Sequence, residues 1–141
     1  MDTAFLLFDP ACYLPVSMTP ETILLRQAHP NFVDGNLPTS QVFMPNSGDE
    51  GKMSAYDGDQ ITPEESHAHY TRVLNKQSHS VWGLSCAEVA AETVPGSPDP
   101  RDNSPSHAKI DFSGKTEKEA RRIAKRLKTL ATNRGCLFLA V

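Results

Sequence analysis

Residues 108–141 read AKIDF-SGK-TEKEARRIAKRLKTLATN-RG-CLFLAV, and this last quarter of the chain decides the fold. Its three main parts, Ala108–Phe112, Thr116–Asn133 and Cys136–Val141, predict a strand, a helix and a second strand. The final run is almost continuously apolar, which is typical of a strand covered on both faces. Two strands joined by a crossover helix in one sheet normally run parallel. An antiparallel placement stays open if another strand lies between them.

Several independent signals predict the helix. Thr116 and Glu119 have the spacing of a capping box, in which each side chain accepts a hydrogen bond from the other's backbone N–H. Asn133 and Gly135 favour its end, because both tolerate the left-handed conformation that closes a helix. Apolar residues recur at helical spacing and form one stripe: Ala120, Ile123, Ala124, Leu127, Leu130 and Ala131.

The whole chain, residues 1–141, fits a single small domain. Apolar runs predict further strands at Thr3–Phe8, Thr22–Ala28, Gln41–Met44, Lys52–Tyr56 and Ser80–Ser85. Helices are expected from Thr62 to about Asn75, where Pro63 and Glu65 complete a start signature, and over Cys86–Glu92. We therefore expect an α+β domain, with α/β as the alternative, containing about five strands and two or three helices.

Residues 93–106 contain four of the eleven prolines. This composition predicts a long loop that supplies no core, and long loops in compact domains are often functional.

Charge is unevenly distributed along the chain. Residues 115–134 hold eight of the fourteen basic residues and two of the seventeen acidic ones, although the net charge is −3. No apolar stretch is long enough to span a membrane, and no signal-peptide pattern is present. The three cysteines match no zinc pattern and leave one unpaired in any disulfide scheme. We therefore expect a cytoplasmic protein with no membrane partner.

The basic helix is the first candidate contact surface. Its candidate partner-binding residues are Lys118, Arg121, Arg122, Lys125, Arg126 and Lys128, which lie on the sides that the apolar stripe leaves free. An acidic protein would suit them, nucleic acid is the alternative, and an ordinary solvated face is a third interpretation. A pI near 5.9 argues against a dedicated nucleic-acid binder, and no aromatic residue in the run offers a stacking platform.

Catalytic residues are unknown from sequence, but five candidates stand out: Arg26, His29, Tyr56, Asp57 and His107. Arg26 interrupts an apolar strand and would grip a phosphate or carboxylate if it faced a cleft. His29 or His107 would transfer protons near neutral pH. If the protein is an enzyme, these five side chains should converge in one pocket. No nucleophile, P-loop or dinucleotide-binding motif is present.

The sequence predicts no metal and no cofactor. His67 and His69 are two residues apart on a predicted helix, so they would not share a face. The acidic run Asp57-Gly58-Asp59 has a density that suits a divalent cation, but it lacks the spacing of a calcium loop. A turn is the favoured interpretation, because Asp-Gly is a frequent turn pair.

Four short motifs are similar to those of short bacterial proteins with no assigned function: Arg26–Pro30 (RQAHP), Ser40–Pro45 (SQVFMP), Tyr56–Asp59 (YDGD) and His107–Phe112 (HAKIDF). The resemblance would run from about residue 24 to the end of the chain. It implies a bacterial origin and no mechanism.

These patterns favour a small interaction or accessory protein that docks an acidic partner through its basic C-terminal helix. A toxin–immunity or defence complex is the setting we expect for such a subunit. The alternative is a small hydrolase or transferase that acts on a phosphorylated or nucleotide substrate, so enzymatic activity stays an open question.

Overall fold

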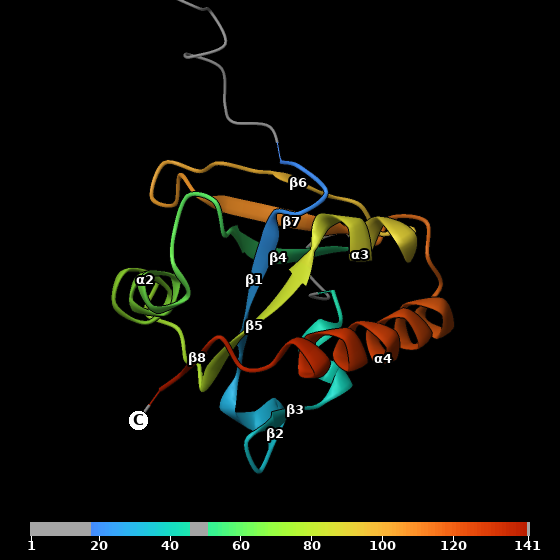
Figure 1. Ribbon diagram of the computed structural model, residues 1–141, viewed down its shortest axis with the longest axis horizontal. Helices are drawn as coiled ribbons and strands as arrows, with labels where there is room; N and C mark the ends of the chain where they lie inside the picture. Colours follow the sequence, from blue (N-terminus) through green and yellow to red (C-terminus); the bar gives the residue numbers. More distant parts are fainter. Residues whose placement is uncertain (1–17, 46–50, 141) are drawn as a thin grey trace, which may run out of the picture.

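The computed structural model describes residues 18–45 and 51–140, and it shows an α+β domain built on one large sheet (Figure 1). Its six strands lie in the order β6–β7–β4–β1–β5–β8, and all neighbours are antiparallel. The strands are β1 (Ile23–Ala28), β4 (Lys52–Asp57), β5 (Ser80–Ser85), β6 (Gly96–Pro98), β7 (His107–Asp111) and β8 (Phe138–Leu139). The α+β prediction is confirmed. The α/β alternative does not hold for these strands, because that class is built on a mostly parallel sheet.

A small hairpin, three α-helices and three short 3₁₀ or π-helical segments complete the described elements. β2 (Val33–Asp34) and β3 (Leu37–Pro38) pair across the predicted turn, where Gly35 has a φ of +64° that suits glycine. The helices are α2 (Pro63–Ala68), α3 (Cys86–Ala91) and α4 (Glu117–Arg134). α2 continues into a π-helical turn, η4 (His69–Val73), so the helix predicted from Thr62 to about Asn75 is confirmed.

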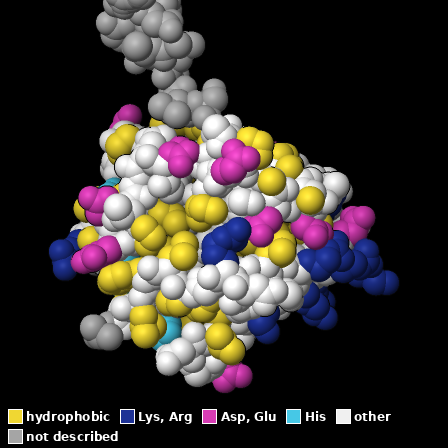
Figure 2. Space-filling view, viewed as in Figure 1, with side chains coloured by type: hydrophobic (Ala, Val, Ile, Leu, Met, Phe, Trp, Pro, Cys, Tyr) yellow, Lys and Arg dark blue, Asp and Glu magenta, His cyan; other side chains and the backbone are white. Residues whose placement is uncertain are grey.

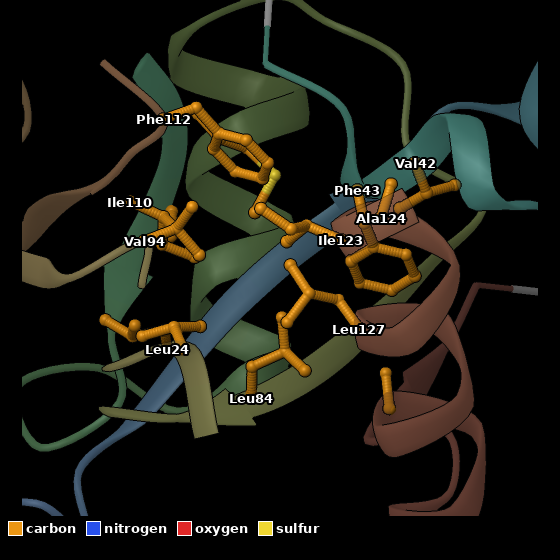
Figure 3. Close-up of a cluster of buried hydrophobic side chains, with 14 of the residues drawn as sticks. Leu24, Val42, Phe43, Leu84, Val94, Ile110, Phe112, Ile123, Ala124 and Leu127 are labelled. Carbon is orange, nitrogen blue, oxygen red and sulfur yellow. The ribbon is translucent and has the colours of Figure 1, made fainter. Parts of the chain in front are cut away.

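Helices lie on both sides of the sheet. Figure 1 shows α2 on the left and α4 on the right, with the strands between them. α4 and the 3₁₀ helix η3 (Ser40–Phe43) cover one face, where the larger core lies. Figure 3 shows this core, in which Leu24 and Leu84 from the sheet meet Ile123 and Leu127 from α4. A smaller cluster packs Tyr70 of η4 against the opposite face.

α4 forms as its sequence predicts. Thr116 accepts from the Glu119 backbone N–H at 3.1 Å, and Glu119 accepts from the Thr116 N–H at 2.8 Å. The helix ends before Gly135, whose φ is +101°. Its buried residues are Ala120, Ile123, Ala124, Leu127 and Ala131, which are the core of the predicted stripe.

The strand predicted over Cys136–Val141 is much shorter. β8 spans only Phe138–Leu139 and pairs with β5 at one edge of the sheet. Phe138 is half-buried and Leu139 is exposed, so the strand is not covered on both faces. Three strands separate β8 from β7, and the alternating antiparallel order makes these two strands run in the same direction.

The strand predicted over Gln41–Met44 is wrong, because this segment is the 3₁₀ helix η3. Val42 and Phe43 are both buried in the core beside α4. A strand would send adjacent side chains to opposite faces, whereas a helical turn lets both enter the same core.

The segment 93–106 is more ordered than its prolines suggest. Gly96–Pro98 forms β6, which pairs with β7, and Val94 is completely buried in the main core. Gly96 packs so closely that an added Cβ would lie 2.7 Å from Leu24 Cδ1. The prediction that this segment supplies no core is therefore wrong.

The remaining elements agree with expectation where they are described. Strands form at Ile23–Ala28, Lys52–Asp57 and Ser80–Ser85, and α3 occupies the predicted short helix. The strand predicted at Thr3–Phe8 lies outside the described residues. Within residues 18–45 and 51–140, no helix has the length and apolarity needed to cross a membrane.

Candidate functional site

A pocket of about 290 Å³ lies where β1 and β4 separate. β1 pairs with β5 along all six of its residues, but it pairs with β4 only at Leu24 and Leu25. Beyond this point the Arg26 guanidinium bridges the two strands. Its Nε donates to the Val42 carbonyl at 2.8 Å, and its Nη1 donates to the Ser54 carbonyl at 2.7 Å. The side chain thus supplies a donor to a β4 carbonyl that has no backbone partner on β1.

Four separate parts of the chain form the pocket walls. Residues 25–27 of β1 and 54–56 of β4 line one part. Tyr70, Leu74 and Lys76 line a second wall, and the segment before β7 together with His107 closes the rest. The site therefore brings together residues up to 82 positions apart in sequence, Leu25 and His107.

Three of the five candidate catalytic residues line this pocket: Arg26, Tyr56 and His107. They come from β1, β4 and β7, respectively. The other two, His29 and Asp57, do not contribute to the lining. The structure thus brings together an arginine, a tyrosine and a histidine, but not the complete predicted set.

His29 and Asp57 form local hydrogen bonds instead. His29 caps the 3₁₀ helix η2 (Pro30–Phe32), where its Nδ1 accepts from the Asn31 backbone N–H at 3.0 Å. Asp57 is buried, and its two carboxylate oxygens accept from the Asp59 N–H and the Gln60 side-chain amide, each at 2.9 Å. These bonds hold the turn that the Asp-Gly-Asp sequence predicts.

Tyr56 is joined to the segment before β7 through His69. The His69 Nε2 lies 2.7 Å from the Asn103 carbonyl, which can only accept, so Nε2 is the donor. In the neutral ring Nδ1 is then an acceptor, and the Tyr56 hydroxyl donates to it at 2.7 Å. Burial, together with the nearby Tyr70 hydroxyl, raises the pKa of Tyr56 far above its usual value. Tyr56 is therefore a neutral, fixed wall of the pocket.

His107 is held by Asp99. Its Nδ1 donates to the Asp99 carbonyl at 3.0 Å and lies 3.2 Å from the Asp99 carboxylate, which also pairs with Arg101 at 3.1 Å. Burial and the neighbouring Arg101 charge hold the pKa of His107 below its usual value. The ring is accordingly neutral at pH 7, with Nε2 as its unprotonated nitrogen.

The charged side chains that line the pocket are all cationic. They are Arg26, Lys76 and Arg101, and the described lining contains no Asp or Glu. Ser104 also lines the pocket, and its buried hydroxyl has no hydrogen-bond partner within the described part of the chain. A concave site with cations and a spare hydroxyl is suited to an anionic group.

Sequence reasoning missed Lys76, Arg101, Asn103 and Ser104 as pocket residues. Lys76 follows a helix end, and the other three lie in the segment that was expected to be a loop. For the three residues in this segment, the sequence offers one general indication, namely that a long loop in a compact domain is often functional. No local pattern indicates that these residues meet β1 and β4.

The cationic side chains of α4 differ in their exposure and in whether they form ion pairs. Lys118, Arg122 and Lys125 are exposed, Lys128 is partly so, and in residues 18–45 and 51–140 none of the four makes an ion pair. Arg121 pairs with Glu117 one turn away at 2.7 Å, with both side chains mostly exposed. Figure 2 shows Lys and Arg side chains gathered over α4 at the right, with acidic side chains along the upper border.

Two arginines of α4 instead contact α3 and the residue that follows it. The Arg126 Nε donates to Glu92 at 2.6 Å, and the Arg134 Nη1 donates to Glu88 at 2.7 Å. Both glutamates are less than a quarter exposed, at 18% and 24%. Arg126, a candidate partner-binding residue, is therefore engaged within the protein.

In the described residues, no group of three His, Cys, Asp or Glu side chains is placed to hold a metal ion.

No protein-family model matches this sequence, and no curated protein or solved structure is significantly similar to it.

Proposed function

We propose that this protein is a small accessory protein that docks an acidic protein partner through the outer face of α4. The observation that supports this proposal most is the stripe of Lys118, Arg122, Lys125 and Lys128, which makes no ion pair with the described acidic residues. We call these four residues the α4 stripe.

The spacing of the α4 stripe suits one extended contact. Its members recur every three or four residues, so they lie along one side of the helix. From Lys118 to Lys128 the helix rises about 15 Å at roughly 1.5 Å per residue. Arg121 borders the stripe, and its exposed pair with Glu117 is weak enough to exchange for a partner carboxylate.

An acidic protein suits this face better than nucleic acid. The sequence has a net charge of −3 although α4 is basic, so a long polyanion that extended beyond α4 would meet net negative charge. α4 contains no aromatic residue on which a base would stack. A toxin–immunity or defence complex in a bacterial cytoplasm is the setting that we propose for this interaction.

Quantitative affinity purification tests the proposal. Tagged wild-type protein and the double variant Arg122→Glu/Lys125→Glu are used to capture proteins from cells of the source species, followed by mass spectrometry. The wild type should enrich a protein with an acidic surface. Charge reversal should weaken its purified complex by about 30-fold, at roughly 1 kcal/mol for each reversed contact. Affinity should also fall with added salt.

The matched control is Lys52→Glu/Arg72→Glu, which changes the net charge equally. Lys52 lies on β4, next to Met53 and so on the face opposite the main core, and Arg72 lies on η4. This variant should retain the partner. If both variants bind as the wild type does, or if purified complexes contain nucleic acid bound through α4, the proposal is refuted.

The second candidate is a small hydrolase or transferase that acts on a phosphorylated or nucleotide substrate. The convergence of Arg26, Tyr56 and His107 on one pocket favours it. His107 would be its proton-transfer residue, since Asp99 orients the ring and leaves Nε2 unprotonated. Turnover of phosphate esters by the wild type and its loss in His107→Asn would support this candidate. Absence of turnover with bound ester would refute it.

A further inference from the structure

The pocket between β1 and β4 has the three properties of a built ligand site: one sign of charge, an unpartnered polar group and an apolar wall. Arg26, Lys76 and Arg101 bring positive charge to it from three separate parts of the chain, and its described lining contains no carboxylate. A concave site with a single sign of charge focuses the field and attracts counter-ions.

The cations are held in position by neighbouring groups. Arg26 is fixed by the Val42 and Ser54 carbonyls. The Lys76 ammonium lies 5.7 Å from the centre of the Tyr70 ring, and the Arg101 guanidinium is bonded to Asp99 at 3.1 Å. Arg101 is the member of this ion pair that lines the pocket, whereas Asp99 lies outside the lining. Each cation therefore has a neighbouring group that restrains it, which lowers the entropic cost of binding.

Ser104 provides an independent indication of a ligand. The residue is 2% exposed, and its hydroxyl lacks a hydrogen-bond partner within residues 18–45 and 51–140. A buried hydroxyl without a partner is destabilising, so native proteins rarely retain one without a reason. Because Ser104 lines the pocket, a ligand oxygen is a natural partner for it.

The lining also contains apolar and aromatic side chains. They are those of Leu25, Leu74, Tyr56 and Tyr70, and Tyr56 is fixed by its bond to His69. The volume of about 290 Å³ corresponds to a small metabolite, since pockets for drug-sized ligands start near 300 Å³. A peptide or a nucleic-acid strand does not fit such a space.

From these features we propose that the pocket binds a small phosphate monoester with a ring or other apolar part, which has about the size of a mononucleotide. The phosphate would lie between Lys76, Arg101 and the Ser104 hydroxyl, while the ring would contact Tyr70 and Leu74. Phosphate suits this set better than carboxylate, because it carries more charge and has three terminal oxygens for converging donors.

This inference uses the same pocket as the second candidate function but requires no catalysis. Binding without turnover would support the inference and refute that candidate. It is also independent of docking through α4.

Calorimetric titration tests the inference with four probes: phenyl phosphate, adenosine 5′-monophosphate, benzoate and phenol. The two phosphate monoesters should bind with saturation and at least about tenfold more tightly than benzoate, which corresponds to roughly one extra charge-assisted hydrogen bond. Phenol should show no saturable binding. Equal affinity for benzoate and phenyl phosphate, or no saturable binding of either ester, would overturn the proposal.

Three variants locate the site. Lys76→Met and Arg101→Gln should each weaken binding of phenyl phosphate by about tenfold or more. Ser104→Ala should weaken binding without lowering the stability of the free protein, because the hydroxyl has no partner to lose. Urea midpoints and circular dichroism establish that each variant is folded.

Two further variants separate the pocket from general charge. Arg72→Met removes an exposed cation outside the lining, and Arg122→Glu/Lys125→Glu reverses the α4 stripe. Both should bind phenyl phosphate as tightly as the wild type does. If either loses binding to the same extent as Arg101→Gln, the ester is held by surface charge and the proposal is wrong.

Discussion

The variant Arg134→Ala tests whether Arg134 of α4 stabilises the fold while the α4 stripe does not. The Arg134 Nη1 donates to Glu88 at 2.7 Å and to the Gly83 carbonyl at 2.9 Å, so this side chain joins α4 to α3 and β5. Its side chain is 27% exposed and that of Glu88 is 24% exposed. Arg134→Ala should therefore lower stability far more than the loss of any α4 stripe residue.

The size of this effect follows from the two bonds. A hydrogen bond to a charged group contributes about 1.5–3 kcal/mol, which we reduce to about 1–1.5 kcal/mol because water reaches this pair. The bond to the Gly83 carbonyl adds about 0.5–1 kcal/mol. The total of about 2 kcal/mol corresponds to a fall in Tm of roughly 7 °C for a domain of this length.

Urea unfolding at neutral pH measures this difference, with Arg121→Ala as the matched control. Arg121 pairs with Glu117, but their side chains are 66% and 71% exposed, so its loss should cost at most about 0.5 kcal/mol. Lys125→Ala should likewise cost little. Two results would refute the claim that Arg134 stabilises the fold and the α4 stripe does not: Arg134→Ala unfolds at the wild-type urea midpoint, or Lys125→Ala is equally destabilising.

The dependence of stability on acidic pH provides a second test of the Arg134–Glu88 ion pair. Burial alone would raise the pKa of Glu88, but hydrogen bonds from Arg134 and Ser85 hold it below its usual value. A carboxyl group with a lowered pKa stabilises the fold above its unfolded pKa, and this contribution is lost as pH falls through the folded pKa. The stability difference between wild type and Arg134→Ala should therefore shrink below about pH 4.

Three other predictions concern the core, a close backbone contact and His107. Leu127→Ala empties a completely buried position in the main core, and denaturant unfolding should show a loss of about 2–5 kcal/mol. Gly58→Ala places a Cβ against the Ile23 carbonyl, so it should destabilise the protein by about 1–3 kcal/mol; a neutral effect would contradict the close approach. Because the pKa of His107 is lowered, the unfolded chain takes up a proton first as pH falls from about 7.5 to about 5.5, and stability should fall. His107→Asn, which keeps a donor for the Asp99 carbonyl, should flatten this slope in urea titrations; an unchanged slope would exclude His107 as its source.

Elements that are marked by a strong local sequence pattern could be predicted from the sequence. The capping boxes at Thr62 and Thr116 placed two helix starts correctly, because their hydrogen bonds join residues only three positions apart. The same pattern at Ser85 and Glu88 starts α3. The strand order could not be predicted, because it depends on pairing between distant segments.

The candidate site was only partly predictable for the same reason. Arg26, Tyr56 and His107 were suggested by residue type, and their meeting required knowledge of the order β7–β4–β1. Lys76, Arg101 and Ser104 lie in segments that lack periodicity, so nothing local marked them. Arg126 was grouped with the free cations because its partner Glu92 is 34 residues away in sequence.

A two-dimensional NMR titration tests the central claim most directly. The ¹⁵N-labelled protein is titrated with the purified acidic partner, or with a synthetic peptide copied from its acidic surface. Docking through α4 should shift backbone amides between Lys118 and Thr129, and none at Arg101–His107 in the pocket. Shifts confined to the pocket, or spread evenly over all exposed cations, would contradict it.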